Sequence, residues 1–161
     1  MASEPTRLAI SCQMGNLTRE IVEKTGKFNV SVLTEDVPFE TIRHFGMQSG
    51  RDTDKFADFV GFDRSHNGLP YLTEHTNAMF SCEVKEKTDL GSHMMFIGEV
   101  TEAKVLGKGN SCTSAHYHKA IKPKFKKLYG AKRKLCPFSL HFIWFYDKIV
   151  PSRIRRNAHV P

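Results

Sequence analysis

The chain has 161 residues, which is long enough for one domain with a hydrophobic core, and its composition is ordinary for a globular protein. It contains no apolar run of about 18 residues, so we expect no membrane span. Residues 1–118 carry 12 basic and 16 acidic residues, whereas residues 119–161 carry 12 basic residues and one acidic residue. The net charge of +7 therefore combines a mildly acidic body with a strongly basic tail.

The four cysteines are widely spaced and form no C-x-x-C pair. They are Cys12, Cys82, Cys112 and Cys136. This spacing argues for free thiols in a reducing cytoplasm rather than for a disulfide framework or a zinc site. The first residues, MASEPTRLAIS, lack the basic-then-apolar order of a signal peptide. We therefore expect a cytoplasmic protein without a bound metal.

The first third of the chain shows strand and helix patterns in alternation. Residues 7–12 and 27–33 each alternate along their length, which predicts two short strands. Residues 17–25 carry apolar side chains on one helical face, and they predict a helix that Asn16 caps and Gly26 ends. A second helix is expected to start near residues 36–38 and to turn its aromatic residues toward the core.

Residues 45–56, FGMQSGRDTDKF, combine two glycines with basic and acidic residues. Gly50 allows a sharp turn that a residue with a Cβ would resist. Arg51 and Lys55 are four residues apart, so one helical turn after Gly50 would point both in the same direction. Such a turn suits a phosphate group. As an isolated motif, however, the stretch fits a solvated charged loop better.

The second half of the chain predicts strands joined by turns. Residues 59–70 hold several breakers and predict a loop. Residues 78–84 predict a strand, and residues 93–105 predict the clearest strand of the chain. Gly98 within it indicates a bulge, or the close approach of another backbone or of a ligand. Because there is no βαβ rhythm, we expect a mainly β fold with a few helices, arranged as an antiparallel barrel.

Four stretches resemble, in order and spacing, the flavin reductase-like family of FMN-binding split barrels. They are NLTREIVEKTGKFNVSVL (16–33), FGMQSGRDTDKF (45–56), LPYLTE (69–74) and GSHMMFIGEV (91–100). The resemblance covers residues 7–118 and is strongest to members from anaerobic microbes, including those fused to rubredoxin.

This resemblance implies an antiparallel split β-barrel that forms a homodimer, with a flavin near the dimer interface. It implies an oxidoreductase that passes electrons from NAD(P)H or a protein donor through the flavin to an acceptor, such as ferric iron or rubredoxin. FMN is the expected cofactor, with FAD as the alternative, and NAD(P)H is the expected co-substrate. Because a flavin carries the redox chemistry itself, the protein needs no catalytic acid or base.

The resemblance also assigns roles to eight residues. Asn16 and Thr18 fall in the segment that lines the flavin phosphate and ribityl chain. His93 is implied to lie close to the flavin or nicotinamide ring, as the catalytic position. The signature beside the flavin phosphate comprises Ser49, Gly50, Arg51, Asp52 and Lys55.

Two parts of the chain depart from the family pattern. Family members begin with a strand pair carrying a G-M-T-x-N-type segment, whereas this chain opens at a strand that follows such a pair. We therefore expect a split-barrel domain over residues 1–118 that is incomplete at its N-terminus and has an exposed sheet edge. Residues 119–161 are expected to form a separate basic, aromatic-rich tail, whose composition fits a fusion or a shifted reading frame.

Other readings stay open from the residues alone. An incomplete barrel fits a non-enzymatic remnant that binds flavin weakly or not at all. The basic, aromatic tail fits single-stranded nucleic acid, but a solvated end has the same composition, so nucleic acid is not the expected partner. The spacing of Cys112, His116 and His118 would suit a metal, although the sequence shows no fourth ligand. Cys12 and Cys82 are expected to be buried, inert thiols.

Overall fold

The computed structural model describes residues 2–123. Five strands form one sheet: β1 (Ala2–Ser3), β2 (Thr6–Gln13), β3 (Lys27–Leu33), β6 (Thr76–Asp89) and β7 (His93–Val105). Two further strands form a hairpin: β4 (Phe62–Arg64) and β5 (Pro70–Leu72). The helices are α1 (Leu17–Thr25), α2 (Phe39–Gly46) and α3 (Ser114–His116), with a π-helical turn, η1 (Tyr117–Ile121), after α3.

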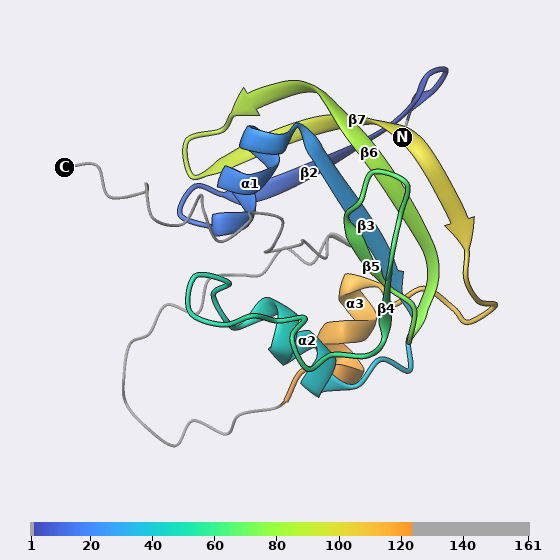
Figure 1. Cartoon of the computed structure of the whole chain (residues 1–161). Coiled ribbons are helices and arrows are strands. Elements are labelled where there is room, and N and C mark those ends of the chain that lie inside the picture. Colours follow the sequence, from blue (N-terminus) through green and yellow to red (C-terminus); the bar gives the residue numbers. More distant parts are fainter. Residues whose placement is uncertain (1, 124–161) are drawn as a thin grey trace.

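The large sheet is antiparallel throughout and has the strand order β1-β2-β7-β6-β3. Figure 1 shows α1 at one end of this sheet, with α2 and α3 together at the other end. From Leu8 to Cys12, the outer edge of β2 pairs with no other described strand. Within the described residues, no helix is long and apolar enough to cross a membrane.

Most of the predicted elements are confirmed. The helix over 17–25 and the strands over 27–33 and 93–105 have the predicted bounds, and β2 and β6 extend beyond theirs. Gly26 ends α1 in the left-handed conformation, with φ +66°, and its N–H donates to Val22 O at 2.9 Å. The expected boundary after residue 118 falls inside η1, and the tail beyond residue 123 lies outside the described residues.

The predicted loop over 59–70 is wrong, because part of it forms the β4–β5 hairpin. The breakers that favoured a loop form the turn of this hairpin. Ser65 N donates to Leu69 O at 3.0 Å, and Gly68 takes a φ of +83° that favours glycine. Strands of three residues are too short to show the alternation by which a strand is recognised.

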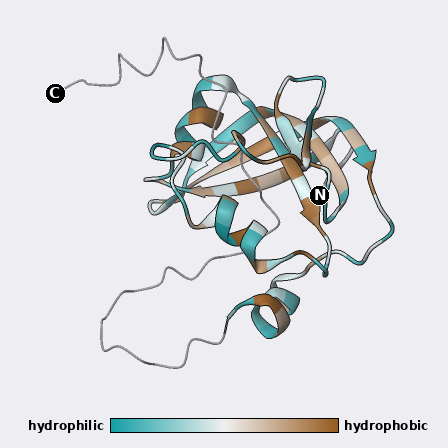
Figure 2. Ribbon diagram, turned by 60° about the horizontal axis from the view of Figure 1, so that its bottom comes forward, coloured by the Kyte–Doolittle hydropathy of each residue, from teal (hydrophilic) through white to brown (hydrophobic). Residues whose placement is uncertain are grey.

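The core has two hydrophobic clusters. One packs α1 against β2, β3, β6 and β7, and its buried members are Ile10, Cys12, Val22, Phe28, Val30, Cys82, Met94 and Phe96. The other packs α2 against β5 and the η1 end, and its buried members are Leu33, Val37, Ile42, Phe45, Leu72, Cys112 and Tyr117. Figure 2 shows hydrophobic residues concentrated in the strands, whereas many connecting loops are hydrophilic.

A buried amide fastens the hairpin to the sheet. Asn29 Nδ2 on β3 donates to Ser65 Oγ at 2.8 Å and to Leu69 O at 2.9 Å. Its Oδ1 accepts from Asn67 Nδ2 and from Ser81 Oγ, each at 2.9 Å. Asn29 is 3% exposed, so these bonds satisfy a polar group that would be costly to bury alone. The hairpin thus covers the side of β3 that carries Asn29, while Phe28 and Val30 on the other side belong to the core, so the burial of β3 does not alternate.

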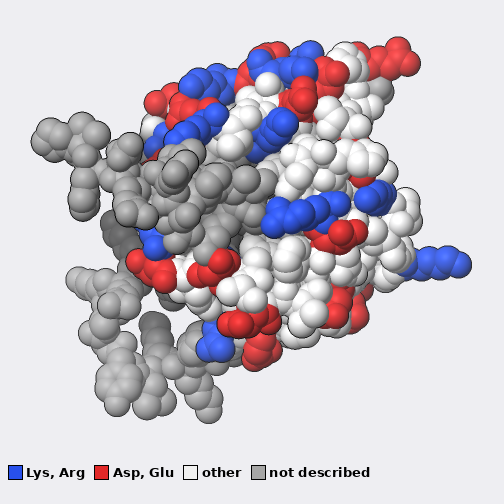
Figure 3. Space-filling model, in the orientation of Figure 1, with Lys and Arg blue, Asp and Glu red and all other residues white. Residues whose placement is uncertain are grey.

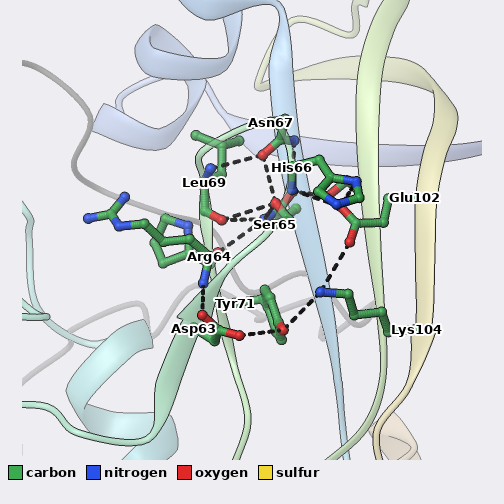
Figure 4. Close-up of polar contacts among 12 residues, drawn as sticks. Asp63, Arg64, Ser65, His66, Asn67, Leu69, Tyr71, Glu102 and Lys104 are labelled. Atoms are coloured by element: carbon green, nitrogen blue, oxygen red, sulfur yellow. Dashed lines mark hydrogen bonds and ion pairs between the residues drawn. The ribbon is translucent and has the colours of Figure 1, made fainter.

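A second set of polar contacts continues this attachment at the protein surface (Figure 4). Tyr71 Oη donates to Asp63 Oδ2 at 3.0 Å, and Lys104 Nζ donates to Tyr71 Oη at 3.3 Å. Lys104 also pairs with Glu102 Oε1 at 3.1 Å. A hydrogen bond from the backbone N–H of His66 lowers the pKa of Glu102, with a smaller contribution from Lys104. The cluster therefore joins both hairpin strands to β7.

Gly98 on β7 lies under the ring of Phe28. A Cβ at position 98 would come 2.5 Å from Phe28 Cζ and 2.9 Å from Cys82 Cβ. The β6–β7 ladder also shifts register between the Val84–Gly98 and Glu86–Ile97 pairs, so the predicted bulge lies directly beside Gly98, with the extra residue on β6. Gly98 thus lies beside a register shift, and the close approach at this position comes from the Phe28 side chain of the core.

We expect Gly98→Ala to lower the free energy of unfolding by about 1–3 kcal/mol, because the Phe28 ring must move to admit the methyl group. Urea unfolding followed by circular dichroism measures this loss. Gly15→Ala is the matched control, since nothing lies within 4 Å of a Cβ there. Equal stability of Gly98→Ala and the unmodified protein would contradict this account of the core.

Candidate functional site

The turn between β2 and α1 forms the centre of the candidate site. Asn16 precedes α1 with an extended backbone (φ −81°, ψ 136°), and its N–H donates to Gln13 O at 3.0 Å. It occupies the predicted cap position, but its side chain makes no capping hydrogen bond. Thr18 lies half-buried in the first helical turn. The amino end of α1 therefore keeps N–H donors and partial positive charge for another acceptor.

His93 lies beside this turn. It is the first residue of β7 and is the partner of Gln13 in the β2–β7 ladder. A hydrogen bond of 3.1 Å from Met14 N to Ser92 O joins the β2–α1 turn to the residue before His93. The half-buried imidazole has its Nδ1 2.8 Å from Ser92 Oγ. The sheet register thus brings His93 next to a turn that is distant in the sequence.

A tight turn begins at Ser49 in the loop after α2. The N–H groups of Asp52 and Thr53 both donate to Ser49 O at 3.2 Å, and Arg51 N donates to Ser49 Oγ at 3.2 Å. The sharp turn predicted at Gly50 is therefore formed, but Gly50 is not among the described glycines with a positive φ. The Ser49 carbonyl and hydroxyl stabilise the turn instead.

Arg51 joins the Ser49 turn to α1. Its Nη2 donates to Glu20 Oε1 at 2.6 Å, and the two side chains are 48% and 41% exposed. Glu20 lies in the first turn of α1. The contact therefore sets two predicted segments against each other at the amino end of α1. The predicted residues on these segments are Asn16, Thr18, Ser49, Gly50, Arg51 and Asp52.

Lys55 does not share the surroundings of Arg51. It is 6% exposed, and its ammonium donates to Phe45 O at 2.8 Å, at the carboxyl end of α2. The Lys55 carbonyl in turn lies 2.7 Å from His44 Nε2. The expected helical turn with both cations on one face is therefore not formed. The carbonyl end of α2 attracts the Lys55 ammonium, while Arg51 reaches α1.

A chain of ion pairs extends from Glu20 along α1. Arg19 Nη2 lies 3.7 Å from Glu20 Oε1, and its Nη1 donates to Glu23 Oε2 at 2.6 Å. Lys87 on β6 also pairs with Glu23, and its hydrogen bond lowers the pKa of that carboxyl. Basic and acidic side chains are interleaved over this end of the molecule in Figure 3.

The residues of this chain of ion pairs were not predicted as part of the site. The spacing of Arg19 and Glu23 is that of a helical i, i+4 pair, which the sequence could have revealed. The contact of Glu20 with Arg51 spans 31 positions and has no local sequence signal.

The thiols and the suspected metal ligands have other roles in the described residues. Burial raises the pKa of Cys12 and of Cys82 to about 12, so both thiols stay neutral and unreactive, as predicted. His116 Nδ1 lies 3.3 Å from Glu35 Oε1. Among residues 2–123, no group of three or more His, Cys, Asp or Glu residues could hold a metal ion.

A model of the flavin reductase like domain matches residues 1–123. The chain belongs to this family. It is 42% identical over 118 residues to the high molecular weight rubredoxin of Moorella thermoacetica, which covers 73% of this chain and 51% of that protein. It is 34% identical over 118 residues to the ferric-chelate reductase (NAD(P)H) of Archaeoglobus fulgidus. This match covers 73% of this chain and 69% of that protein. This flavin reductase-like chain thus spans about half the length of the rubredoxin relative.

Solved structures confirm the fold. The FMN-binding protein from Thermus thermophilus with bound p-hydroxybenzaldehyde has a TM-score of 0.59 and 24% identity, over 65% of this chain and 58% of that chain. The NADH:FAD oxidoreductase of Streptomyces globisporus, in complex with NAD and FAD fragments, has a TM-score of 0.60 and 22% identity. This match covers 69% of this chain and 64% of that chain. The flavin reductase-like chain therefore has the antiparallel split-barrel architecture that its sequence predicts.

Removing either of the two cations of the signature should lower the stability of the protein by a different amount. We expect Lys55→Ala to lower the free energy of unfolding by about 1–3 kcal/mol, because it removes the hydrogen bond from a buried ammonium to Phe45 O. Arg51→Ala should cost less than about 1 kcal/mol, because the Arg51–Glu20 pair is half-exposed. Urea unfolding of the two variants measures both values. Equal losses would show that the two side chains have equivalent structural roles.

Proposed function

We propose that this chain binds FMN at the amino end of α1 and is an oxidoreductase of the flavin reductase type. The observation that carries the proposal is the Arg51–Glu20 contact, which sets the Ser49 turn against α1. An exposed guanidinium, a turn with a serine hydroxyl and the amino end of a helix then face the same region. These are the groups that recognise a phosphate monoester.

In this proposal, each signature residue has a separate task. The guanidinium of Arg51 pairs with the flavin phosphate, and Ser49 and Thr18 offer hydroxyl donors. Asn16 contributes at the helix end, where its side chain is not used as a cap. Gly50 and Asp52 shape the turn, since the Asp52 N–H is bound to Ser49 O. Lys55 fastens the loop to the end of α2 from within the core.

His93 is the proposed neighbour of the reacting ring. Its position at the start of β7, held by the sheet register, fixes the imidazole next to the Asn16 turn. When bound, the flavin supplies the electron-transfer chemistry, so the residues of the chain need only orient the ring and limit access of water. The hydrogen bond with Ser92 would hold the imidazole in one orientation for that purpose.

For the electron donor we propose NAD(P)H or a protein, and for the acceptor a ferric complex or a carrier such as rubredoxin. The names of the two relatives, a ferric-chelate reductase (NAD(P)H) and a high molecular weight rubredoxin, support these choices. We further propose a cytoplasmic homodimer, in which FMN is preferred and FAD is the alternative. The three described cysteines are free, in keeping with a reducing compartment.

Fluorescence titration with FMN tests the proposal. We expect FMN uptake to give a yellow protein that oxidises NADH or NADPH when a ferric chelate is added. Arg51→Ala should weaken FMN binding by about 1–3 kcal/mol, because a charge-assisted bond to the phosphate is lost. Binding of riboflavin, which has no phosphate, should not change.

Arg43→Ala serves as the control, because Arg43 is an exposed arginine on α2. It should leave the affinities for both flavins unchanged. A folded, colourless protein that takes up no added FMN would instead support the reading as a non-enzymatic remnant.

A further inference from the structure

In the ion pair between Arg51 and Glu20, the carboxylate has a second cation close by, whereas the guanidinium has no second acid within the described residues. Glu20 has a second cation close by, because Arg19 Nη2 lies 3.7 Å from the same oxygen, Oε1, that accepts from Arg51. Within residues 2–123, the Arg51 guanidinium has only Glu20 as a partner. Arg51 can therefore release Glu20 without leaving that carboxylate unpaired.

Arg19 is already fixed in a position to take over Glu20. Its Nε donates to Met14 O at 2.9 Å, which anchors the side chain to the β2–α1 turn. Its Nη1 is held by Glu23, and its Nη2 faces Glu20. Arg19 is thus a stationary cation, whereas Arg51 is attached through a single hydrogen bond.

The relative strengths of the contacts favour an exchange. A half-exposed ion pair contributes little to stability, because water and salt screen it. A phosphate dianion offers more negative charge and three acceptor oxygens, and it can accept two parallel N–H groups of a guanidinium. Glu20 occupies one of the five donors of Arg51, so four donors stay available for an incoming phosphate.

We propose that Glu20 is the counter-ion of Arg51 that a flavin phosphate displaces, and that it thereby limits the preference of the site for FMN over riboflavin. The inference rests on the proposed flavin site. On binding, Arg51 exchanges its bond to Glu20 for bonds to phosphate oxygens, and the Glu20 carboxylate closes on Arg19. Glu20 therefore competes with the ligand and lowers the affinity for phosphorylated flavin.

Glu20→Gln tests this competition, because it keeps the shape of the side chain and removes its charge. We expect FMN to bind about two- to fivefold more tightly, the range for the loss of one exposed ion pair, with riboflavin unchanged. Glu23→Gln is the matched control. It makes the same change one turn further along α1, at a carboxylate that contacts Arg19 and Lys87 but not Arg51. It should leave the ratio of the two affinities unchanged.

A second measurement separates the counter-ion role from the flavin function. In the full chain labelled with ¹⁵N, the Arg51 Nε–H signal, assigned with Arg51→Lys, is followed by NMR during titration with inorganic phosphate. We expect a saturable shift that reaches its midpoint at lower phosphate concentration in Glu20→Gln. If this occurs while FMN does not bind, the proposed function and the flavin part of the inference are wrong, and only the competition of Glu20 with phosphate for Arg51 stands.

Two results would overturn the inference itself. If FMN binds but Glu20→Gln weakens its binding or leaves it unchanged, Glu20 orients Arg51 instead of competing for it. If the Arg51 signal does not respond to phosphate in either protein, Arg51 is not an anion site, and the displacement is excluded whatever the flavin affinity is.

Discussion

The pairing of β6 with β7 is the contact on which the rest of the architecture depends. The ladder runs from Ala78 opposite Val105 to Asp89 opposite Met94, and it lies in the middle of the sheet. β3 is built on β6 and β2 is built on β7, so the ladder also fixes the ends of the segment that contains α1. Because side chains alternate along a strand, a slip of one residue would exchange the core face and the outer face of β7.

The sequence predicts the parts of the fold that depend on neighbours along the chain. The end of α1 follows from Gly26, which acts within one turn, and its start has the predicted bound although the Asn16 side chain makes no capping hydrogen bond. The β4–β5 hairpin depends on Asn29 instead, whose amide lies 36 to 41 positions from its partners around Ser65. No local pattern records such a contact, so the breakers within the hairpin predict only a loop.

The candidate site shows the same division. The order of the motifs predicts seven site residues that lie on adjoining segments of the fold. His93 is one of them, and the sheet register places it there. The spacing within one motif is a poorer guide, because it cannot show which side chain is buried. Lys55 reaches the carboxyl end of α2, whereas Arg51 meets a carboxylate on another element. The acid that faces Arg51, Glu20, lies in a different stretch, residues 16–33, and only packing brings the two together.

The buried amide of Asn29 has a consequence for the motions of the protein. Its hydrogen bonds to Ser65, Asn67, Leu69 and Pro70 of the hairpin share one side chain, so they cannot open one at a time without stranding a buried polar group. The hairpin should therefore detach from the sheet as one cooperative unit, with its amide protons exchanging with solvent at a common rate. The sheet behind it, carrying β2, β6 and β7, can keep its own protection while the hairpin opens.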